Sequence, residues 1–157
     1  MKTESGGRVN GGMSVRAAFG LLFFTLAVVI SGCGSDSASE SQIAGGEGAL
    51  GRGTAAFEQK DFITAEKELS AAVMAGVLQP DLLEIAQRTR ARCLIELDRC
   101  DEAELLLAEL EQGAAELDQV WLVRAEMSLK LGDRSAAQSA YDQAKKLNNK
   151  LKPPVGL

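Results

Sequence analysis

The sequence contains no histidine and few aromatic residues. Histidine is absent from all 157 residues, and Phe, Trp and Tyr together make up 4% of them. Histidine is the side chain that most often serves as a general base at neutral pH and most often binds transition metals. Its absence also excludes every Ser-His or Cys-His catalytic pair. We therefore expect neither an enzyme nor a bound cofactor or metal ion.

Positive charge is scarce outside the first part of the chain. The net charge at pH 7 is −5; residues 1–32 contribute +2, so the remainder carries −7, and the charges before residue 33 are Lys2, Arg8 and Arg16 against Glu4. Nucleic-acid binding draws most of its affinity from the neutralisation of phosphates, which an acidic domain does poorly. We expect no nucleic-acid partner.

A short uncharged apolar run follows the basic residues at the start of the chain. It extends over residues 17–30 and directly follows Arg16. A membrane-spanning helix needs about 20 apolar residues, so this run is short for a stable span. A basic region, a short apolar run and then small residues are the layout of a secretory signal peptide, here residues 1–32. Met13 is an alternative start that would leave a compact basic leader.

The apolar run ends in Ile30-Ser31-Gly32-Cys33, which resembles the lipobox of bacterial lipoproteins. The resemblance implies cleavage between Gly32 and Cys33 and a diacylglycerol on the Cys33 sulfur, the nucleophile in lipid transfer. The chain would then be anchored in the cell envelope. Gly34 is not the aspartate of an inner-membrane retention signal, which favours the periplasmic face of the outer membrane, with the inner membrane as the alternative. A transmembrane anchor, or a plain signal peptide with an incidental cysteine, is the other interpretation.

Residues 33–48 are rich in glycine and serine. Segments of this composition behave as flexible coil and cannot bury a core. We expect residues 33–48 to form a flexible tether with a reach of about 20 Å. This division leaves residues 49–150 for a folded domain and residues 151–157 for a tail.

Three similar strings recur in the rest of the chain. Their final alanines are Ala65, Ala103 and Ala137, so the second interval is slightly shorter than the first. Each string lies between two segments whose apolar residues have helical spacing. Alanine and leucine dominate here and β-branched residues are few, as in closely packed helices. The pattern predicts an all-α domain of about three helix pairs stacked into a superhelix, or solenoid, over residues 49–150.

This period resembles that of the tetratricopeptide repeat (TPR) family, in which an antiparallel helix pair recurs every ~34 residues. The resemblance covers about two thirds of the chain and implies small and large apolar residues at fixed packing positions. The residues at these positions are Gly53, Ala65, Leu69, Ala91, Ala103, Leu107, Trp121, Ala125, Ala137 and Tyr141. An unrelated six-helix array or a four-helix bundle is the alternative, but neither predicts the spacing.

Helix-end signals lie between the expected helices. Asp61 and Asp133 can accept hydrogen bonds from the first N–H groups of second helices. Gly132 can end a first helix with a positive φ, and Pro80 suits the first turn of a helix. The other two turns depart from the family pattern, since the residues in place of the turn glycine are Lys60 and Asp98.

Basic residues gather on the expected first helices, at Arg88, Arg90, Arg92, Arg124 and Lys130. Two of them, Arg90 and Arg124, stand at positions where the TPR family usually has an aliphatic residue. In that family the first helices line a concave groove that binds peptides. The resemblance therefore implies that these cations could hold carboxylates of a partner through bidentate hydrogen bonds. The alternative is a set of exposed cations that keep the domain soluble.

Cys93 and Cys100 remain when Cys33 is lipidated. An oxidising compartment outside the cytoplasm permits a disulfide between them. The alternative is a pair of small buried thiols. Two cysteines without histidine are a poor set of metal ligands, in agreement with the expectation of no metal.

These features together predict a membrane-anchored binding module. A stack of helix pairs offers a concave surface to a segment of a partner protein, and anchoring raises its effective concentration near membrane-bound partners. A scaffold or adaptor role in the cell envelope follows by analogy of fold. The alternative is a self-associating structural subunit, a homo-oligomer, because no residues remain for a polar helix that covers the last pair. An enzyme would need an acid pair such as Glu102 with Asp133 in one pocket.

Overall fold

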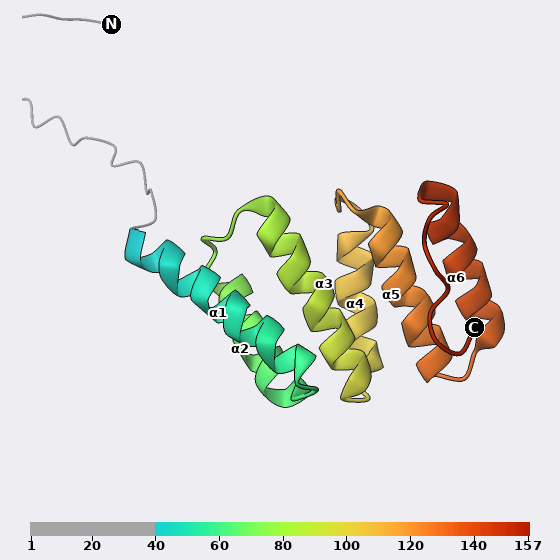
Figure 1. The fold of residues 1–157 in the computed structure, drawn as a ribbon, viewed down its shortest axis with the longest axis horizontal. Helices are drawn as coiled ribbons and strands as arrows, with labels where there is room; N and C mark the ends of the chain where they lie inside the picture. The colour runs from blue at the N-terminus through green and yellow to red at the C-terminus, as the bar shows by residue number, and fades with distance from the viewer. Residues whose placement is uncertain (1–39) are drawn as a thin grey trace, which may run out of the picture. The chain divides into compact units, whose positions relative to one another are not determined.

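The computed structural model describes residues 40–157, which form six α-helices (Figure 1). All of them belong to Asp36–Leu157, the second of two units into which the chain divides. Between residues 40 and 157 there is no strand, and no helix there is long and apolar enough to cross a membrane. The expected signal peptide, Met13, Gly32 and Cys33 lie outside the described residues. The helices are α1 (Glu40–Glu58), α2 (Phe62–Met74), α3 (Pro80–Glu96), α4 (Cys100–Leu110), α5 (Leu117–Lys130) and α6 (Arg134–Leu147).

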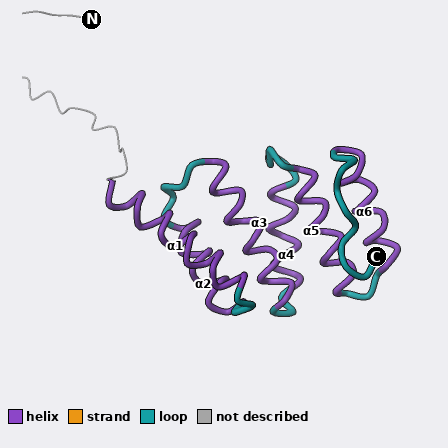
Figure 2. The backbone as a smooth tube through the Cα atoms, in the orientation of Figure 1, coloured by secondary structure: helices purple, strands orange, loops and turns teal. Residues whose placement is uncertain are grey.

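Consecutive helices pack as three antiparallel pairs, α1 with α2, α3 with α4, and α5 with α6, each joined by a short turn (Figure 2). The first helices also pack on one another, α1 on α3 and α3 on α5. Among the described helices, α2, α4 and α6 do not pack on each other. The first helices therefore line the inner face of the array, and the second helices lie on its outer face. This arrangement confirms the predicted all-α superhelix of stacked helix pairs.

The same turn closes each helix pair. The residues that follow the first helices in the left-handed region are Lys60, Asp98 and Gly132, with φ of 61°, 58° and 80°. In each turn the next N–H donates to the carbonyl five residues earlier, which is a Schellman motif. These bonds are Asp61 N to Ala56 O (2.9 Å), Arg99 N to Leu94 O (2.8 Å) and Asp133 N to Ser128 O (2.9 Å). The left-handed residues recur at the same intervals as the three alanines, so the sequence period is also a period of backbone geometry.

The second helices begin with the predicted caps in the first and third pairs. The Asp61 Oδ1 accepts from the Thr64 N–H at 3.1 Å, and the Asp133 Oδ1 accepts from the Ala136 N–H at 2.8 Å. Hydrogen bonds from the side chain and from the backbone N–H of Thr64 hold the pKa of Asp61 below its ordinary value. In the middle pair the cap position is Arg99, whose side chain makes no capping bond. The two predicted aspartate caps are confirmed, and Pro80 begins α3 as predicted.

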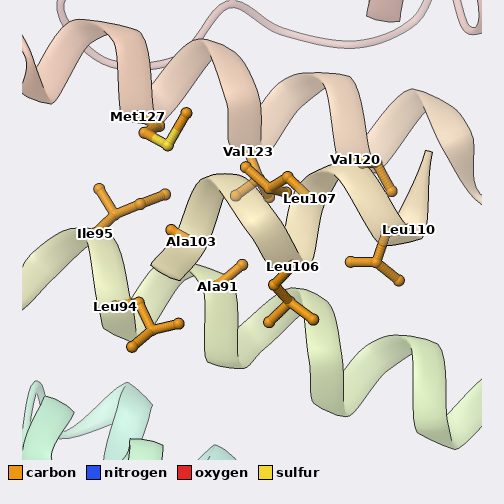
Figure 3. Close-up of a cluster of buried hydrophobic side chains, with 10 residues drawn as sticks. All are labelled: Ala91, Leu94, Ile95, Ala103, Leu106, Leu107, Leu110, Val120, Val123 and Met127. Atoms are coloured by element: carbon orange, nitrogen blue, oxygen red, sulfur yellow. The ribbon is translucent and has the colours of Figure 1, made fainter. Parts of the chain in front are cut away.

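Three clusters of buried hydrophobic side chains hold the pairs together. The first joins α1, α2 and α3 around Leu69. The second joins α3, α4 and α5, whose side chains, among them Leu107 and Val123, converge in Figure 3. The third lies between α5 and α6 around Tyr141. The residues expected at packing positions are buried, except for Trp121, which is half-buried. Small residues at these positions allow the helices to approach closely.

Helix α1 begins at Glu40, so the prediction of a flexible tether as far as Gly48 is wrong over residues 40–48. Gly46 is buried, and a Cβ added to it would lie 2.7 Å from Cγ2 of Val77. The glycine therefore permits close packing of α1 against the loop after α2. Composition alone does not distinguish glycine used for close packing from glycine used for flexibility.

The segment after α6, residues 151–157, folds back alongside α6 (Figure 1). Leu151 and Leu157 pack against the third cluster, which includes Tyr141. Tyr141 Oη donates a 2.9 Å hydrogen bond to the Leu151 carbonyl, and Arg134 donates to the Leu157 carbonyl. As predicted, no helix follows α6 up to residue 157, but an extended segment that the sequence analysis did not foresee packs against the last pair. The described fold thus extends from residue 40 to residue 157, and the homo-oligomer stays a prediction.

Candidate functional site

A hollow of about 680 Å³ lies on the inner face of the array. Its apolar lining residues are Phe57 from α1, Ile95 from α3, and Leu122 and Leu129 from α5. Three of these four side chains are half-buried, and Ile95 is buried. Residues 152–155 of the C-terminal segment form a further wall. This inner-face hollow therefore combines all three first helices with the tail.

Charged side chains complete the lining, and most of them are paired. Arg92 on α3 holds Glu126 on α5 through two hydrogen bonds of 2.8 and 3.3 Å. Lys130 Nζ lies 3.7 Å from Glu96 and 3.3 Å from Asp98. The hydrogen bond with Asp98 raises the pKa of Lys130 above its ordinary value. These pairs tie the C-terminal half of α5 to α3 and its turn.

Lys152 differs from the other lining cations. Within residues 40–157 its ammonium group has no ion-pair partner, and its side chain is exposed. The lining contains three cations and two carboxylates, and both carboxylates are already bonded to the other two cations. The charged side chains that line the hollow therefore sum to +1, and Lys152 is the one among them without an ion-pair partner within the described residues.

The other three predicted binding cations lie outside this lining and link helices. Arg88 pairs with Glu84 (3.1 Å) and Glu116 (2.8 Å). The Glu84 carboxylate also accepts backbone N–H bonds from Ala115 and Glu116, at 2.7 and 3.0 Å. Arg88 thereby fixes the loop between α4 and α5. Of the five predicted cations, the structure brings only Arg92 and Lys130 to the hollow, and all five hold carboxylates of the chain itself.

Arg90 and Arg124 form the same ion pair in successive units. Arg90 Nε lies 3.0 Å from Glu66 on α2, and Arg124 Nη1 lies 2.8 Å from Glu104 on α4. Each arginine directly precedes a buried small residue of a first helix, and each glutamate directly follows a buried alanine of the preceding second helix. The arginines that depart from the family pattern thus clamp one helix pair to the next.

Arg124 has more partners than Arg90, because it also pairs with Glu111. Burial alone would lower its pKa, but hydrogen bonds with Glu104 and Glu111 outweigh burial and raise the pKa above its ordinary value. Its guanidinium also lies 5.7 Å from the centre of the Trp121 ring. Sequence reasoning missed these clamps. The signal that could have found them is the recurrence of Arg before the small residue, together with Glu after the alanine.

Cys93 and Cys100 are both free thiols, so the disulfide left open by the sequence is not formed. Cys93 is buried in the first cluster, whereas Cys100 packs against the second. Burial raises the pKa of Cys93 to about 11. The Cys93 thiol is therefore protonated at neutral pH and behaves as a small apolar side chain.

The remaining carboxylates considered for chemistry have structural partners. Glu102 accepts two 2.6 Å hydrogen bonds from Arg99, and Asp133 caps α6. Among residues 40–157 there is no group of three or more His, Cys, Asp and Glu side chains that could hold a metal ion.

The class of this protein has to be assigned from its geometry, because comparisons with known proteins found no match. No protein-family model, curated protein or solved structure matches this chain. The fold and the inner-face hollow define an all-α helical repeat domain of three pairs. The last pair is covered by the chain's own C-terminal segment.

Proposed function

We propose that this protein is an exported lipoprotein, anchored by a lipid on Cys33, whose TPR-like domain binds a segment of a partner protein as a scaffold or adaptor in the cell envelope. The observation that carries the proposal is the inner-face hollow, which apolar side chains from α1, α3 and α5 line together. Ligand sites in proteins are concave, mainly apolar and about 300–1,000 Å³ in volume. The hollow has all three properties.

The repeated turn geometry supports the TPR-like assignment. Three Schellman motifs at similar intervals, with buried small residues at matching places, are what a tandem array of helix pairs requires. In such an array the first helices provide the binding face. On this face Arg92 and Lys130 hold the helices in place through ion pairs within the chain.

The start of α1 at Glu40 leaves a short connection between the proposed anchor and the domain. Residues 34–39 alone separate Cys33 from α1. Six residues can span at most about 20 Å. A lipid on Cys33 would therefore keep the domain close to the membrane surface and raise its effective concentration for membrane-bound partners. The outer membrane, on its periplasmic face, is the proposed location.

The anchor is tested by producing the full chain and a Cys33→Ser variant in a bacterial host. Fractionation and mass spectrometry should show a processed, lipid-modified wild type in the membrane fraction. The variant should stay unprocessed or appear in another fraction. Unmodified full-length wild type in the cytosol would overturn the exported lipoprotein.

The binding face is tested with a library of displayed random peptides, selected on the full chain in detergent. Leu129→Glu places a charge in the hollow, and Leu105→Glu makes the same change on α4, where the side chain is 74% exposed. Peptides enriched on the wild type should lose binding to Leu129→Glu and keep it with Leu105→Glu. Circular dichroism checks that both variants are folded. Equal enrichment on wild type and Leu129→Glu would contradict the proposed site.

A further inference from the structure

The C-terminal segment stands where the first helix of a further unit would pack. Leu151 follows Leu117, the first residue of α5, by the same interval that separates Ala137 from Ala103. It packs against the cluster of Tyr141, which occupies the position on α6 that Leu107 occupies on α4. Leu107 belongs to the cluster that receives α5. Proline at positions 153 and 154 excludes a regular helix here, so an extended segment fills a groove between units.

This segment is at the same time part of the proposed binding site. Lys152, Pro153, Pro154 and Val155 form one wall of the inner-face hollow. The Val155 side chain is fully exposed, which leaves an apolar group at the edge of the hollow without a partner. If the segment left its groove, the hollow would lose this wall and Lys152 together. The hollow is therefore complete only while the segment is docked.

The charge of the lining indicates what the hollow accepts. Arg92 holds Glu126 through two hydrogen bonds, and Glu96 lies 3.7 Å from Lys130, so each carboxylate of the lining already faces a cation. Lys152 is the lining charge without a partner within the described residues. A ligand that covers the apolar lining and brings one carboxylate to Lys152 leaves no charge unpaired, and unpaired charges are costly to bury.

We propose that the inner-face hollow binds an extended protein segment with apolar side chains beside a carboxylate, and that it does so only with residues 151–157 docked. This inference rests on the proposed function and adds a ligand class and a control element to it. Because the segment is part of the site, ligand binding and docking stabilise each other, and linkage makes this coupling reciprocal. The docked segment thus forms a wall of the site on which binding depends.

Trp121 makes docking measurable, because it is the sole tryptophan of the chain and shares the third cluster with Leu151 and Leu157. The double variant Leu151→Ser, Leu157→Ser removes both anchors and changes none of the residues that line the hollow. Its matched control is Leu131→Ser, Leu147→Ser, which alters two leucines with exposures of 63% and 56%. The Trp121 emission should shift to longer wavelength in the first variant and stay unchanged in the second.

Binding is measured by fluorescence anisotropy on the full chain in detergent. The probes are two labelled nine-residue peptides with the same Leu and Pro residues, one with a central Glu and one with a central Lys. We expect the Glu peptide to bind more tightly than the Lys peptide. Its affinity should fall by about ten-fold in the undocked double variant. Lys152→Glu should weaken binding of the Glu peptide by about five-fold and make the Lys peptide the tighter binder. Lys67→Glu, on the outer face, should change neither affinity.

A measurement on the unaltered chain covers the case in which the double variant does not fold. Trypsin cleaves after Lys150 and releases residues 151–157, whereas the Lys152–Pro153 bond resists it. The Glu peptide should slow this release by about ten-fold at saturation, because linkage is reciprocal. Unchanged release, or unchanged binding to a folded, undocked variant, would overturn the role of the segment. If both probes fail while library peptides still bind in a Leu129-dependent way, the ligand class is wrong and the proposed function stands. If the library also yields nothing, both fail.

Discussion

The first and third helix pairs, α1 with α2 and α5 with α6, share one turn geometry built from different residues. Both end their first helix in a Schellman motif and cap their second helix with an aspartate, Asp61 or Asp133. The left-handed residue of the turn is Gly132 in the third pair but Lys60 in the first. A fixed backbone conformation therefore tolerates a residue that it does not favour, provided that the helices on both sides are held by packing.

The same two pairs solve the packing between helices in different ways. In the first pair Gly53 faces the fully buried Leu69, and in the third pair Ala125 lies in one cluster with Tyr141. The contact between Gly53 and Leu69 is apolar and involves only α1, α2 and α3. In the third pair the Tyr141 hydroxyl donates to the Leu151 carbonyl, so the packing of this pair includes the C-terminal segment. We expect substitutions in the first pair to act on stability, and those in the third pair to act on the tail.

The largest effect should come from Leu69→Ala. Leu69 is 0% exposed in the first cluster, so truncation removes buried apolar contacts and leaves a cavity. We expect a loss of about 3 kcal/mol in the free energy of unfolding, measured by urea denaturation. Leu105→Ala, on the exposed face of α4, is the control and should change stability by less than about 0.5 kcal/mol. A loss below about 1 kcal/mol for Leu69→Ala would mean that the first pair is loosely packed.

Alkaline pH should destabilise the protein through the first cluster. The pKa of Cys93 is raised from 9.0 to about 11, so between these values the unfolded chain has lost the thiol proton and the folded chain retains it. Unfolding then releases a proton, and stability falls as pH rises through this window, by about 2–3 kcal/mol near pH 11. Cys93→Ala should remove this part of the pH dependence, and Cys100→Ala should keep it. An identical decline in Cys93→Ala would assign the effect to other groups.

Two glycines of α1 should respond to alanine with opposite signs. A Cβ on Gly53 would lie 2.7 Å from Leu69 Cγ and 3.1 Å from its backbone nitrogen, whereas nothing lies within 4 Å of a Cβ on Gly51. Gly53→Ala should lower stability by about 1–2 kcal/mol, because overpacking outweighs the gain in helix propensity. Gly51→Ala should raise it by about 0.5–1 kcal/mol. Thermal unfolding of both variants tests the pair, and stabilisation by Gly53→Ala would contradict the close contact.

These contrasts show what could be predicted from the sequence. The period at Ala65, Ala103 and Ala137, and the two aspartate caps, follow from local spacing, because helix pairs and caps depend on residues a few positions apart. The inter-unit partners of Arg90 and Arg124 lie 24 and 20 residues away. The recurrence of Arg and Glu at matching places hints at such pairs, but only the stacking of the units shows that the two side chains meet.

The two ends of the domain could not be predicted for a related reason. The glycines near Gly46 have the composition of a linker, and only the proximity of Val77 shows that they serve close packing. Residues 151–157 carry no helical pattern, and proline excludes a helix there, so a search for a capping helix overlooks them. An extended cap is recognised by the groove that it fills, not by its own sequence. The hollow was missed because part of its wall is this cap.

Tyr141→Phe should sharpen the contrast at the third pair. The change removes the Tyr141 hydroxyl that donates to the Leu151 carbonyl and leaves the buried ring in place. The domain should lose about 1 kcal/mol of stability. The emission of Trp121 should shift towards that of the undocked double variant, because the tail loses one of its two hydrogen bonds to α6. A change in helix content with no change in Trp121 emission would place the effect in the helix pair and not in the tail.

The smallest effect should come from the turn of the first pair. Lys60 has a φ of 61°, a conformation that is unfavourable for a residue with a side chain, and glycine adopts it freely. Lys60→Gly should stabilise the domain by about 0.5–1 kcal/mol, since the relief outweighs the added freedom of the unfolded chain. Gly132→Ala should destabilise it by about 1 kcal/mol at the equivalent turn. Lys67→Gly, inside α2, is the control and should cost about 1 kcal/mol through helix propensity. If Lys60→Gly destabilised the domain as Lys67→Gly does, the first turn would not share the left-handed conformation of the third.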